Sequence, residues 1–169
     1  SQPWTIPQGY SQRIVSDESN LNIYAGSDWN DMNTVNETGK HAGRYMYRTH
    51  EVRPSASNPG AYTGGAVSVV DLKTGEAKIV AQRLDWEALD GIVWTPWGTV
   101  LFAEETGSSV FTDPDHPAAI RGLVYEMKLD KKDPTKAESI KVRPMLGSVS
   151  HEGIEFDSEG NVYVIDENG

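Results

Sequence analysis

One stretch of the sequence occurs twice, and this repeat constrains the fold more than any other feature. Residues 90–105 read DGIVWTPWGTVLFAEE and residues 152–167 read EGIEFDSEGNVYVIDE, so they align without a gap at a shift of 62 residues. Each copy has an acid before Gly-Ile, a turn closed by glycine, a run of apolar and β-branched residues, and two final carboxylates. Such runs on both sides of a glycine turn indicate a β-hairpin. The chain is therefore predicted to repeat one hairpin-based unit.

Strand signals dominate the rest of the chain. Runs rich in β-branched and aromatic residues, bounded by turn residues, predict strands at residues 44–52, 65–72, 76–82, 98–105, 122–129, 138–146 and 161–166. Helical periodicity is weak, and its best candidate, residues 83–91, has room for only a turn or two. Residues 17–43 and 53–63 are polar and indicate long loops. The fold class expected is all-β.

The repeat selects among the all-β architectures. An outer hairpin at residues 64–81 precedes the inner hairpin 90–105, and residues 121–142 precede 151–167 in the same order. Four strands per unit, repeated with inserted residues, predict a blade of a β-propeller, whereas a sandwich gives no reason for such a repeat. A weaker third copy, GRYMYRTHE, puts Glu51 in the place of Glu105 at a shift of 54.

About three blades are too few to close a propeller, which needs about four to eight. The last copy reaches only Asn168-Gly169, in the middle of a blade. We expect residues 1–169 to form part of a single propeller domain of about six blades. Residues 1–43 would be an N-terminal segment and long loop, and residues 44–169 would form the blades. The partner expected is the remaining set of blades, from another chain or another part of the precursor.

The repeated acids predict a shared site, because equivalent positions on successive blades lie on one ring. Glu51, Glu105 and Glu167 end the same type of strand, while Asp90 and Glu152 begin the strand before it. Antiparallel neighbours bring the end of one strand beside the start of the other, so these acids are expected at one rim of the channel. Side chains alternate along a strand, so one carboxylate of each final pair should face the opposite way.

Clustered carboxylates cannot all stay ionised without a proton or a cation among them. Hard oxygen ligands favour Ca²⁺ or Mg²⁺, and Ca²⁺ accepts the larger and looser sets of ligands. His50 and His151 are possible additional ligands, and imidazole would widen the choice to iron, manganese or zinc. The alternative is that the acids cap strand ends in solvent and the histidines only hydrogen-bond to loops.

Composition limits the partners. The net charge of -10 disfavours nucleic acid and anionic membranes, which need Lys and Arg, and suits a protein that gathers cations. The sequence has no cysteine and no apolar run long enough to span a membrane. Its opening, SQPWTIPQGY, lacks an initiator Met, as expected for a mature form after removal of a signal peptide and equally for a chain from which a tag was cleaved. Trp86, Trp94 and Trp97 are expected to pack between blades, with a ligand platform as the alternative.

Three segments together resemble one known family. TPWGTVLFAEE (95–105), HEGIEFDSEGNVYVIDEN (151–168) and YRTHEV followed by GGAVSVVDLKTGE are similar to the PhoX-type alkaline phosphatases and related secreted propellers, over roughly residues 44–169. The resemblance implies a secreted or periplasmic propeller that holds calcium and iron ions at one end of its channel and hydrolyses phosphomonoesters. It also implies that Glu51, Glu105, Glu152 and Glu167 are metal ligands.

The sequence departs from the family at one position. The phosphatases have an iron-ligating cysteine just before the Glu-Glu pair, and Ala103 stands there in this chain. Iron loses its thiolate ligand, while the oxygen ligands for Ca²⁺ remain. The leading hypothesis is a PhoX-like calcium-binding propeller that is a candidate hydrolase of small phosphate esters. The alternatives are a non-catalytic, calcium-stabilised propeller and a gluconolactonase-type hydrolase with one divalent ion, so whether the protein is an enzyme stays open.

Overall fold

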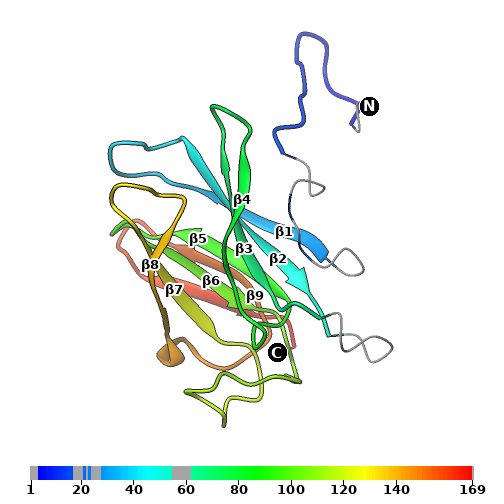
Figure 1. The fold of residues 1–169 in the computed structure, drawn as a ribbon, viewed down its shortest axis with the longest axis vertical. Coiled ribbons are helices and arrows are strands. Elements are labelled where there is room, and N and C mark those ends of the chain that lie inside the picture. Colours follow the sequence, from blue (N-terminus) through cyan, green and yellow to red (C-terminus); the bar gives the residue numbers. More distant parts are fainter. Residues whose placement is uncertain (1–3, 17–20, 22, 24–27, 55–61, 169) are drawn as a thin grey trace.

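The computed structural model describes residues 4–16, 21, 23, 28–54 and 62–168, and it is all-β in these ranges (Figure 1). The strands are β1 (Asp28–Val35), β2 (Tyr45–Val52), β3 (Ala66–Asp71), β4 (Ala77–Gln82), β5 (Leu89–Trp94), β6 (Val100–Glu104), β7 (Val124–Leu129), β8 (Ala137–Val142), β9 (His151–Phe156) and β10 (Val162–Asp166). A 3₁₀ turn, η3 (Pro144–Leu146), follows β8. Within the described ranges no helix has the length and apolar character needed to cross a bilayer.

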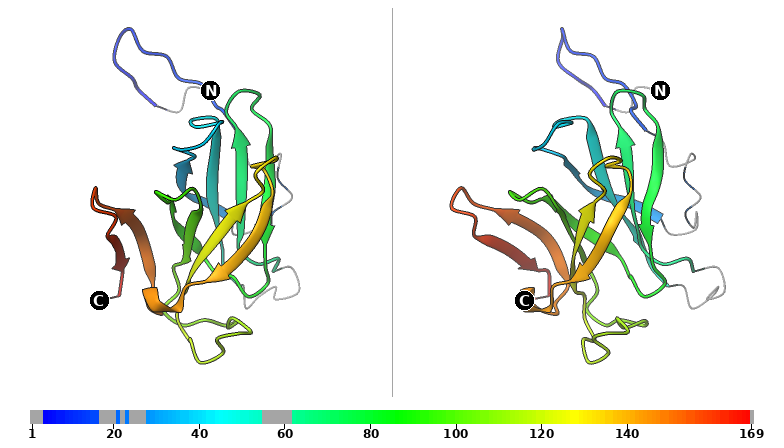
Figure 2. Two further views of the ribbon diagram at one scale, coloured as in Figure 1. Left: turned by 90° about the vertical axis from the view of Figure 1, so that its left-hand side faces the viewer. Right: turned by 60° about the vertical axis from the view of Figure 1, so that its left-hand side comes forward.

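The strands form three antiparallel sheets in simple chain order. Sheet 1 is β1-β2-β3-β4, sheet 2 is β5-β6-β7-β8, and sheet 3 is the pair β9-β10. Figure 2 shows the sheets side by side, with sheet 3 at one end. Strand β5 contacts β1 on one side and β9 on the other, so the first strands of the three sheets are neighbours.

The boundary between sheets differs from the predicted one. The inner hairpin β5-β6 pairs with the outer hairpin that follows it, through Val100↔Met127 and Phe102↔Tyr125, and not with the hairpin before it. Residues 83–88 make this change of sheet, with a turn closed by Trp86 N–H to Arg83 O at 3.2 Å in place of the expected helix. Both outer hairpins look alike in sequence, so only packing between the sheets selects the partner.

The predicted long loop at residues 17–43 was also partly wrong, because β1 lies within it. Its sequence, DWNDMNTV, is too polar to signal a strand. The strand forms because its backbone pairs with β2 from Val52 to Met46, and Met32 packs against the main core. Residues 17–20, 22, 24–27 and 55–61 of the two expected loops lie outside the described residues.

The main core lies between sheets 1 and 2 and is rich in aromatic rings. Trp86 has no exposed surface and meets Phe102 edge-on, with ring centroids 5.0 Å apart. Trp94 stacks on Tyr47 with centroids 6.1 Å apart. These two tryptophans therefore pack between units as predicted. Trp97 does not, since 58% of its surface is exposed and its indole N–H donates to Glu126.

A smaller core joins sheet 2 to sheet 3. Its buried residues are Val93, Leu101, Ala103, Val124 and Ile154. The strand β6 thus has two covered faces, with Phe102 turned to sheet 1 and its neighbours Leu101 and Ala103 turned to sheet 3. This alternation fixes which face of β6 carries each carboxylate of the Glu104-Glu105 pair, with Glu104 on the face of Phe102 and Glu105 on the face of Ala103.

Candidate metal centre

Each sheet begins with a strand that has a β-bulge at the same place. In every case two residues of the first strand lie opposite one residue of the second. The pairs that flank the bulges are Asn30↔His50 with Asn33↔Arg48, Leu89↔Glu104 with Ile92↔Phe102, and His151↔Asp166 with Ile154↔Val164. The first bulged residue is an acid each time, namely Asp31, Asp90 or Glu152. Bulges re-aim side chains, so the fold presents an acid at three equivalent points.

Asp31 is the member of this set that the sequence analysis missed. It precedes Asp90 by 59 residues, close to the shift of 62 between Asp90 and Glu152. The usable signal was the spacing alone, because Met32-Asn33 replaces the Gly-Ile that follows the other two acids. Asp31 is exposed, and its carboxyl lies near Glu51 and Asp90.

The second strands contribute a parallel set of acids. Glu51, Glu105 and Glu167 each follow the residue that pairs with the start of a bulge. The backbone contacts agree, since Glu105 N–H donates to Ala88 O at 2.8 Å and Glu167 N–H donates to Ser150 O at 3.0 Å. The register thus supports the equivalence that the sequence repeat predicts for these three glutamates.

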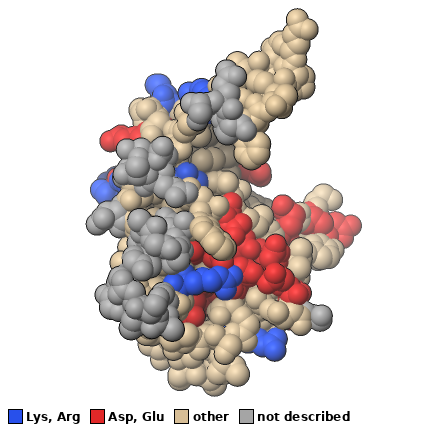
Figure 3. Space-filling model, turned by 90° about the vertical axis from the view of Figure 1, so that its right-hand side faces the viewer, with Lys and Arg blue, Asp and Glu red and all other residues tan. Residues whose placement is uncertain are grey.

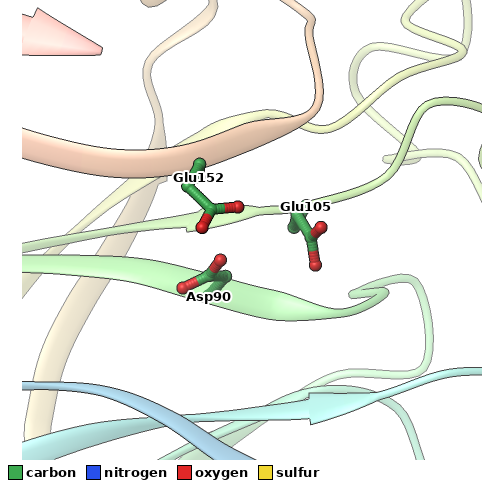
Figure 4. Close-up of side chains that lie close together, drawn as sticks. All are labelled: Asp90, Glu105 and Glu152. Carbon is green, nitrogen blue, oxygen red and sulfur yellow. The ribbon is translucent and has the colours of Figure 1, made fainter. Parts of the chain in front are cut away.

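Three of the acids converge in space. Asp90, Glu105 and Glu152 each offer a carboxylate oxygen, and these oxygens lie within 4.8 Å of one another. Figure 4 shows them pointing toward one another from β5, from the end of β6 and from β9. Figure 3 shows that acidic side chains gather on this face of the molecule, with a basic side chain across them. We call Asp90, Glu105 and Glu152 the acidic cluster.

A single arginine joins two acids at the edge of the acidic cluster. Arg53 donates from Nε to Glu51 Oε1 at 2.5 Å and from its terminal guanidinium nitrogen to Glu105 Oε2 at 2.6 Å. The sequence analysis missed Arg53. It lies two residues after Glu51, and the period-2 rule for strands would have placed it on the same face.

The pKa values show how poorly the remaining negative charge is compensated. Burial raises the pKa of Asp90 to about 8, and Asp31, Glu152, Glu105 and Glu51 add to the effect. Burial also raises the pKa of Glu105 to about 7, helped by a hydrogen bond with Glu167 and opposed by Arg53. The pKa of Glu51 is raised chiefly by burial, against the pull of Arg53. Asp90 and Glu105 therefore hold protons near neutral pH unless a cation takes the place of these protons.

Glu104 and Glu105 face opposite sides of β6, as the alternation predicted. Glu104 is buried, and its carboxylate accepts hydrogen bonds from the backbone N–H of Glu87 at 2.9 Å and of Leu123 at 3.0 Å. It therefore fixes the connection into β5 and the entry into β7. Glu105 is left to the acidic cluster.

The two histidines lie elsewhere. His50 is buried, and its Nε2 is 2.7 Å from Ser68 Oγ, on the face of sheet 1 turned away from sheet 2. His151 Nε2 is 3.4 Å from Gly147 O, while its buried Nδ1 has no hydrogen-bond partner among the described residues. Burial lowers the pKa of His151, so the neutral imidazole is favoured. The structure does not bring either ring into the acidic cluster.

Ala103, for which the resemblance to the PhoX-type phosphatases would predict a cysteine, is fully buried in the smaller core. Its equivalent in β2 is Thr49, whose hydroxyl donates to the carbonyl oxygen of Asp90 at 2.5 Å. A side chain at position 103 is therefore aimed at the equivalent bulge in β9, beside Glu152.

Comparison with models of protein families gives no match for this chain, and a comparison with curated proteins gives none either.

Proposed function

We propose that the chain forms consecutive blades of a β-propeller. Two sheets have four antiparallel strands in chain order, and the first strands β1, β5 and β9 lie next to one another. All three carry the same acidic bulge, as expected for strands arranged around an axis. Strands β1, β5 and β9, with the residues that follow each of them, line a cavity of about 610 Å³. In the proposed propeller this cavity would be part of the central channel. A propeller of about six blades is the proposed whole.

The function that the site supports best is binding of a divalent cation, with Ca²⁺ as the proposed ion. The observation that carries this proposal is the convergence of the Asp90, Glu105 and Glu152 oxygens within 4.8 Å. All three are hard carboxylate ligands. Ca²⁺ tolerates irregular coordination by such ligands, whereas Mg²⁺ demands near-ideal octahedral geometry. Glu51 lies beside the acidic cluster because it binds Arg53, and Glu167 lies beside it because it contacts Glu105. Both would complete the set of metal ligands.

The proposed ion also removes an electrostatic penalty. Without it, Asp90 and Glu105 hold protons near neutral pH because of burial and neighbouring negative charge. A bound cation makes their ionised forms favourable. A secreted or periplasmic location belongs to this proposal, because extracellular calcium sites work at about 10⁻⁴–10⁻³ M.

Hydrolysis of small phosphate esters is the candidate activity of this site. A bound cation would coordinate the ester oxygens and lower the pKa of an attacking water. Arg53 supplies a guanidinium of the kind that pairs with phosphate, although Glu51 and Glu105, which form ion pairs with it, would compete for it. The alternative enzyme, a gluconolactonase-type hydrolase with a single divalent ion and a different ester substrate, would use the same carboxylates.

A non-catalytic role for the cation is favoured by one observation. Asp90 lies in β5, Glu105 directly follows β6, and Glu152 lies in β9, so the three acids come from two sheets. An ion bound among them would fix sheet 2 to sheet 3. The buried Ala103 in the place of the thiolate agrees with a site for calcium alone.

Calorimetric titration with Ca²⁺ tests the proposal, with Glu152→Gln as the decisive variant. The amide keeps the size of the side chain and removes one charged ligand, so calcium affinity should fall by at least about tenfold. Glu155→Gln is the matched control, because Glu155 is an exposed residue of the same strand and contacts its neighbour Phe156 N–H. Equal affinities in the two variants, or no calcium binding to the unmodified chain, contradict the proposal. Calcium-dependent turnover of a phosphomonoester separates the enzyme from the structural protein.

A further inference from the structure

Sheet 3 differs from the other two sheets at its outer edge. Strand β10 is equivalent to β6, because Val164 pairs with Ile154 as Phe102 pairs with Ile92. In sheet 2 the other edge of β6 pairs with β7. Among the residues that the structure describes, β10 pairs with β9 alone. Within the described part of the chain, its second edge therefore presents backbone groups without a neighbouring strand.

The hydrogen bonds of the hairpin indicate which residues face that edge. Asn161 O accepts from Asp157 N–H across the turn between β9 and β10. Pairing alternates along an antiparallel ladder, so Tyr163 directs its backbone groups to β9, and Val162 and Val164 direct theirs to the open edge. The side chains of Val162 and Val164 pack against the smaller core at the same time.

A shallow apolar hollow lies beside this edge. Its volume is about 130 Å³, and it is lined by Trp97, Leu101, Glu126, Arg143, Met145, Leu146, Phe156 and Val162. Met145 is 75% exposed there and Trp97 is 58% exposed. The hollow therefore continues the packing surface between sheets 2 and 3 past the last strand of sheet 3.

The molecule shows what covers the equivalent surface one sheet earlier. The β7-β8 hairpin adds to β6 and places Tyr125 opposite Phe102 and Met127 opposite Val100. Both side chains are fully buried in the core against sheet 1. The same addition to β10 would put two large side chains opposite Val164 and Val162, over the hollow on sheet 2.

We propose that the open edge of β10 is a docking site for an antiparallel β-hairpin built like β7-β8. The first strand of the hairpin extends sheet 3, and its apolar side chains at two alternate positions fill the hollow lined by Leu101, Met145 and Leu146. This inference deepens the propeller proposed above and rests on it. Its readout does not involve the acidic cluster, so failure of calcium binding and failure of docking are distinguishable.

The test uses the 169-residue chain and a synthetic peptide of residues 122–143, the hairpin for which the structure already provides a template. Hydrogen exchange followed by NMR should show an unprotected Val164 amide in the free protein. The peptide should slow exchange at Val162 and Val164 and shift the fluorescence of the exposed Trp97. A peptide of the same composition in scrambled order should do neither.

Two variants separate edge pairing from other binding. Val164→Pro removes an open-edge donor without removing a bond to β9, and should weaken peptide binding by at least about tenfold. Ile165→Thr alters a side chain on the opposite face and should leave binding unchanged. Unchanged peptide binding by folded Val164→Pro, or absence of binding to the unmodified chain, overturns the proposal. Protection of Val164 in a dimer of the free protein overturns it too, since the occupant is then a second copy.

Discussion

The backbone carbonyl of Glu152 lies 2.8 Å from the point at which a side chain on Gly91 would begin. Gly91 follows Asp90 in the bulge of β5, so the two bulges approach each other through a residue that has no Cβ. The Asp90-Gly91 pair thus has two tasks. The acid points to the cluster, and the glycine lets the next sheet come close enough for the acids to meet.

This contact predicts different outcomes for two equivalent glycines. Gly91→Ala must push the Glu152 carbonyl away, so it should lower the free energy of unfolding by about 1–3 kcal/mol and weaken calcium binding. Gly153→Ala meets only the flexible end of Ile165, at 3.3 Å, and should have the smaller effect on both. Denaturant unfolding and calcium titration of both variants measure this. Equal effects would show that the approach of β9 to β5 is not limited by Gly91.

The aromatic core predicts a second contrast. Trp86→Ala removes a fully buried side chain that contacts Phe102 and Tyr125, and should lower the free energy of unfolding by about 3–5 kcal/mol. Trp97→Ala removes an exposed ring and one hydrogen bond to Glu126, so a loss within about 1 kcal/mol is expected. Urea unfolding followed by circular dichroism gives both values. A loss at Trp97 as large as that at Trp86 contradicts the placement of the core.

The sequence predicted the hairpins and the equivalence of the strand-end glutamates for a local reason. Residues 90–105 and 152–167 carry their own β-branched runs and turns, so each hairpin is specified by neighbouring residues. Neighbouring residues do not decide which sheet a hairpin joins. Strand β6 reaches β7 across the long loop at 106–122, and the choice depends on burial of Phe102 and Tyr125 in a core formed by two sheets.

The same reasoning explains the missed site residues. Asp31 lies in a strand that forms through pairing with β2 and not through its own propensity, so a polar segment concealed a member of the repeat. Arg53 has no counterpart two residues after Glu105 or Glu167, where the sequence has Gly107 and Gly169, so the repeat gave no reason to select it. Acids that lie in repeats of similar sequence were predictable, whereas an acid in a divergent repeat and an arginine unique to one repeat were not.

A pH dependence is expected from Glu126, which lies away from the acidic cluster. Burial alone would raise its pKa, but hydrogen bonds from Thr99, Trp97 and Arg143 outweigh burial and lower it. A lowered pKa in the folded state stabilises the protein above the unfolded value of about 4.3, and this contribution is lost as the pH falls through the folded value. Glu126→Gln should therefore cost about 1–3 kcal/mol at pH 7 and much less at pH 3. Denaturant unfolding at the two pH values checks this, and an equal loss at both contradicts it.

The acidic cluster should give the stability of the cation-free protein a pH dependence of the opposite sense, and it should make calcium binding tighter as the pH rises. The pKa values of Asp90 and Glu105 are raised to about 8 and about 7, above their unfolded values, so the cation-free protein loses stability as the pH rises through them. Calcium binds the ionised carboxylates and must release these protons. Affinity should rise between about pH 6 and 9, and calorimetry in buffers of different ionisation enthalpy should detect proton release. A calcium affinity independent of pH would place the ion elsewhere.

The last prediction concerns Ala103 and the choice of metal. Thr49, its equivalent, reaches the carbonyl of Asp90, so a thiol at position 103 should reach the bulge that carries Glu152. Ala103→Cys adds a soft ligand beside hard ones and should raise the affinity for iron, with a thiolate-to-iron absorption band that the unmodified protein lacks. Ala103→Ser is the matched control, because it has nearly the same size and no thiolate. Both variants overpack a fully buried position and should lose about 1–3 kcal/mol of stability, so iron binding is compared at temperatures where both are folded. If Ala103→Cys binds iron no better than Ala103→Ser, position 103 does not face the metal centre, and the absence of a thiolate there does not explain a preference for calcium.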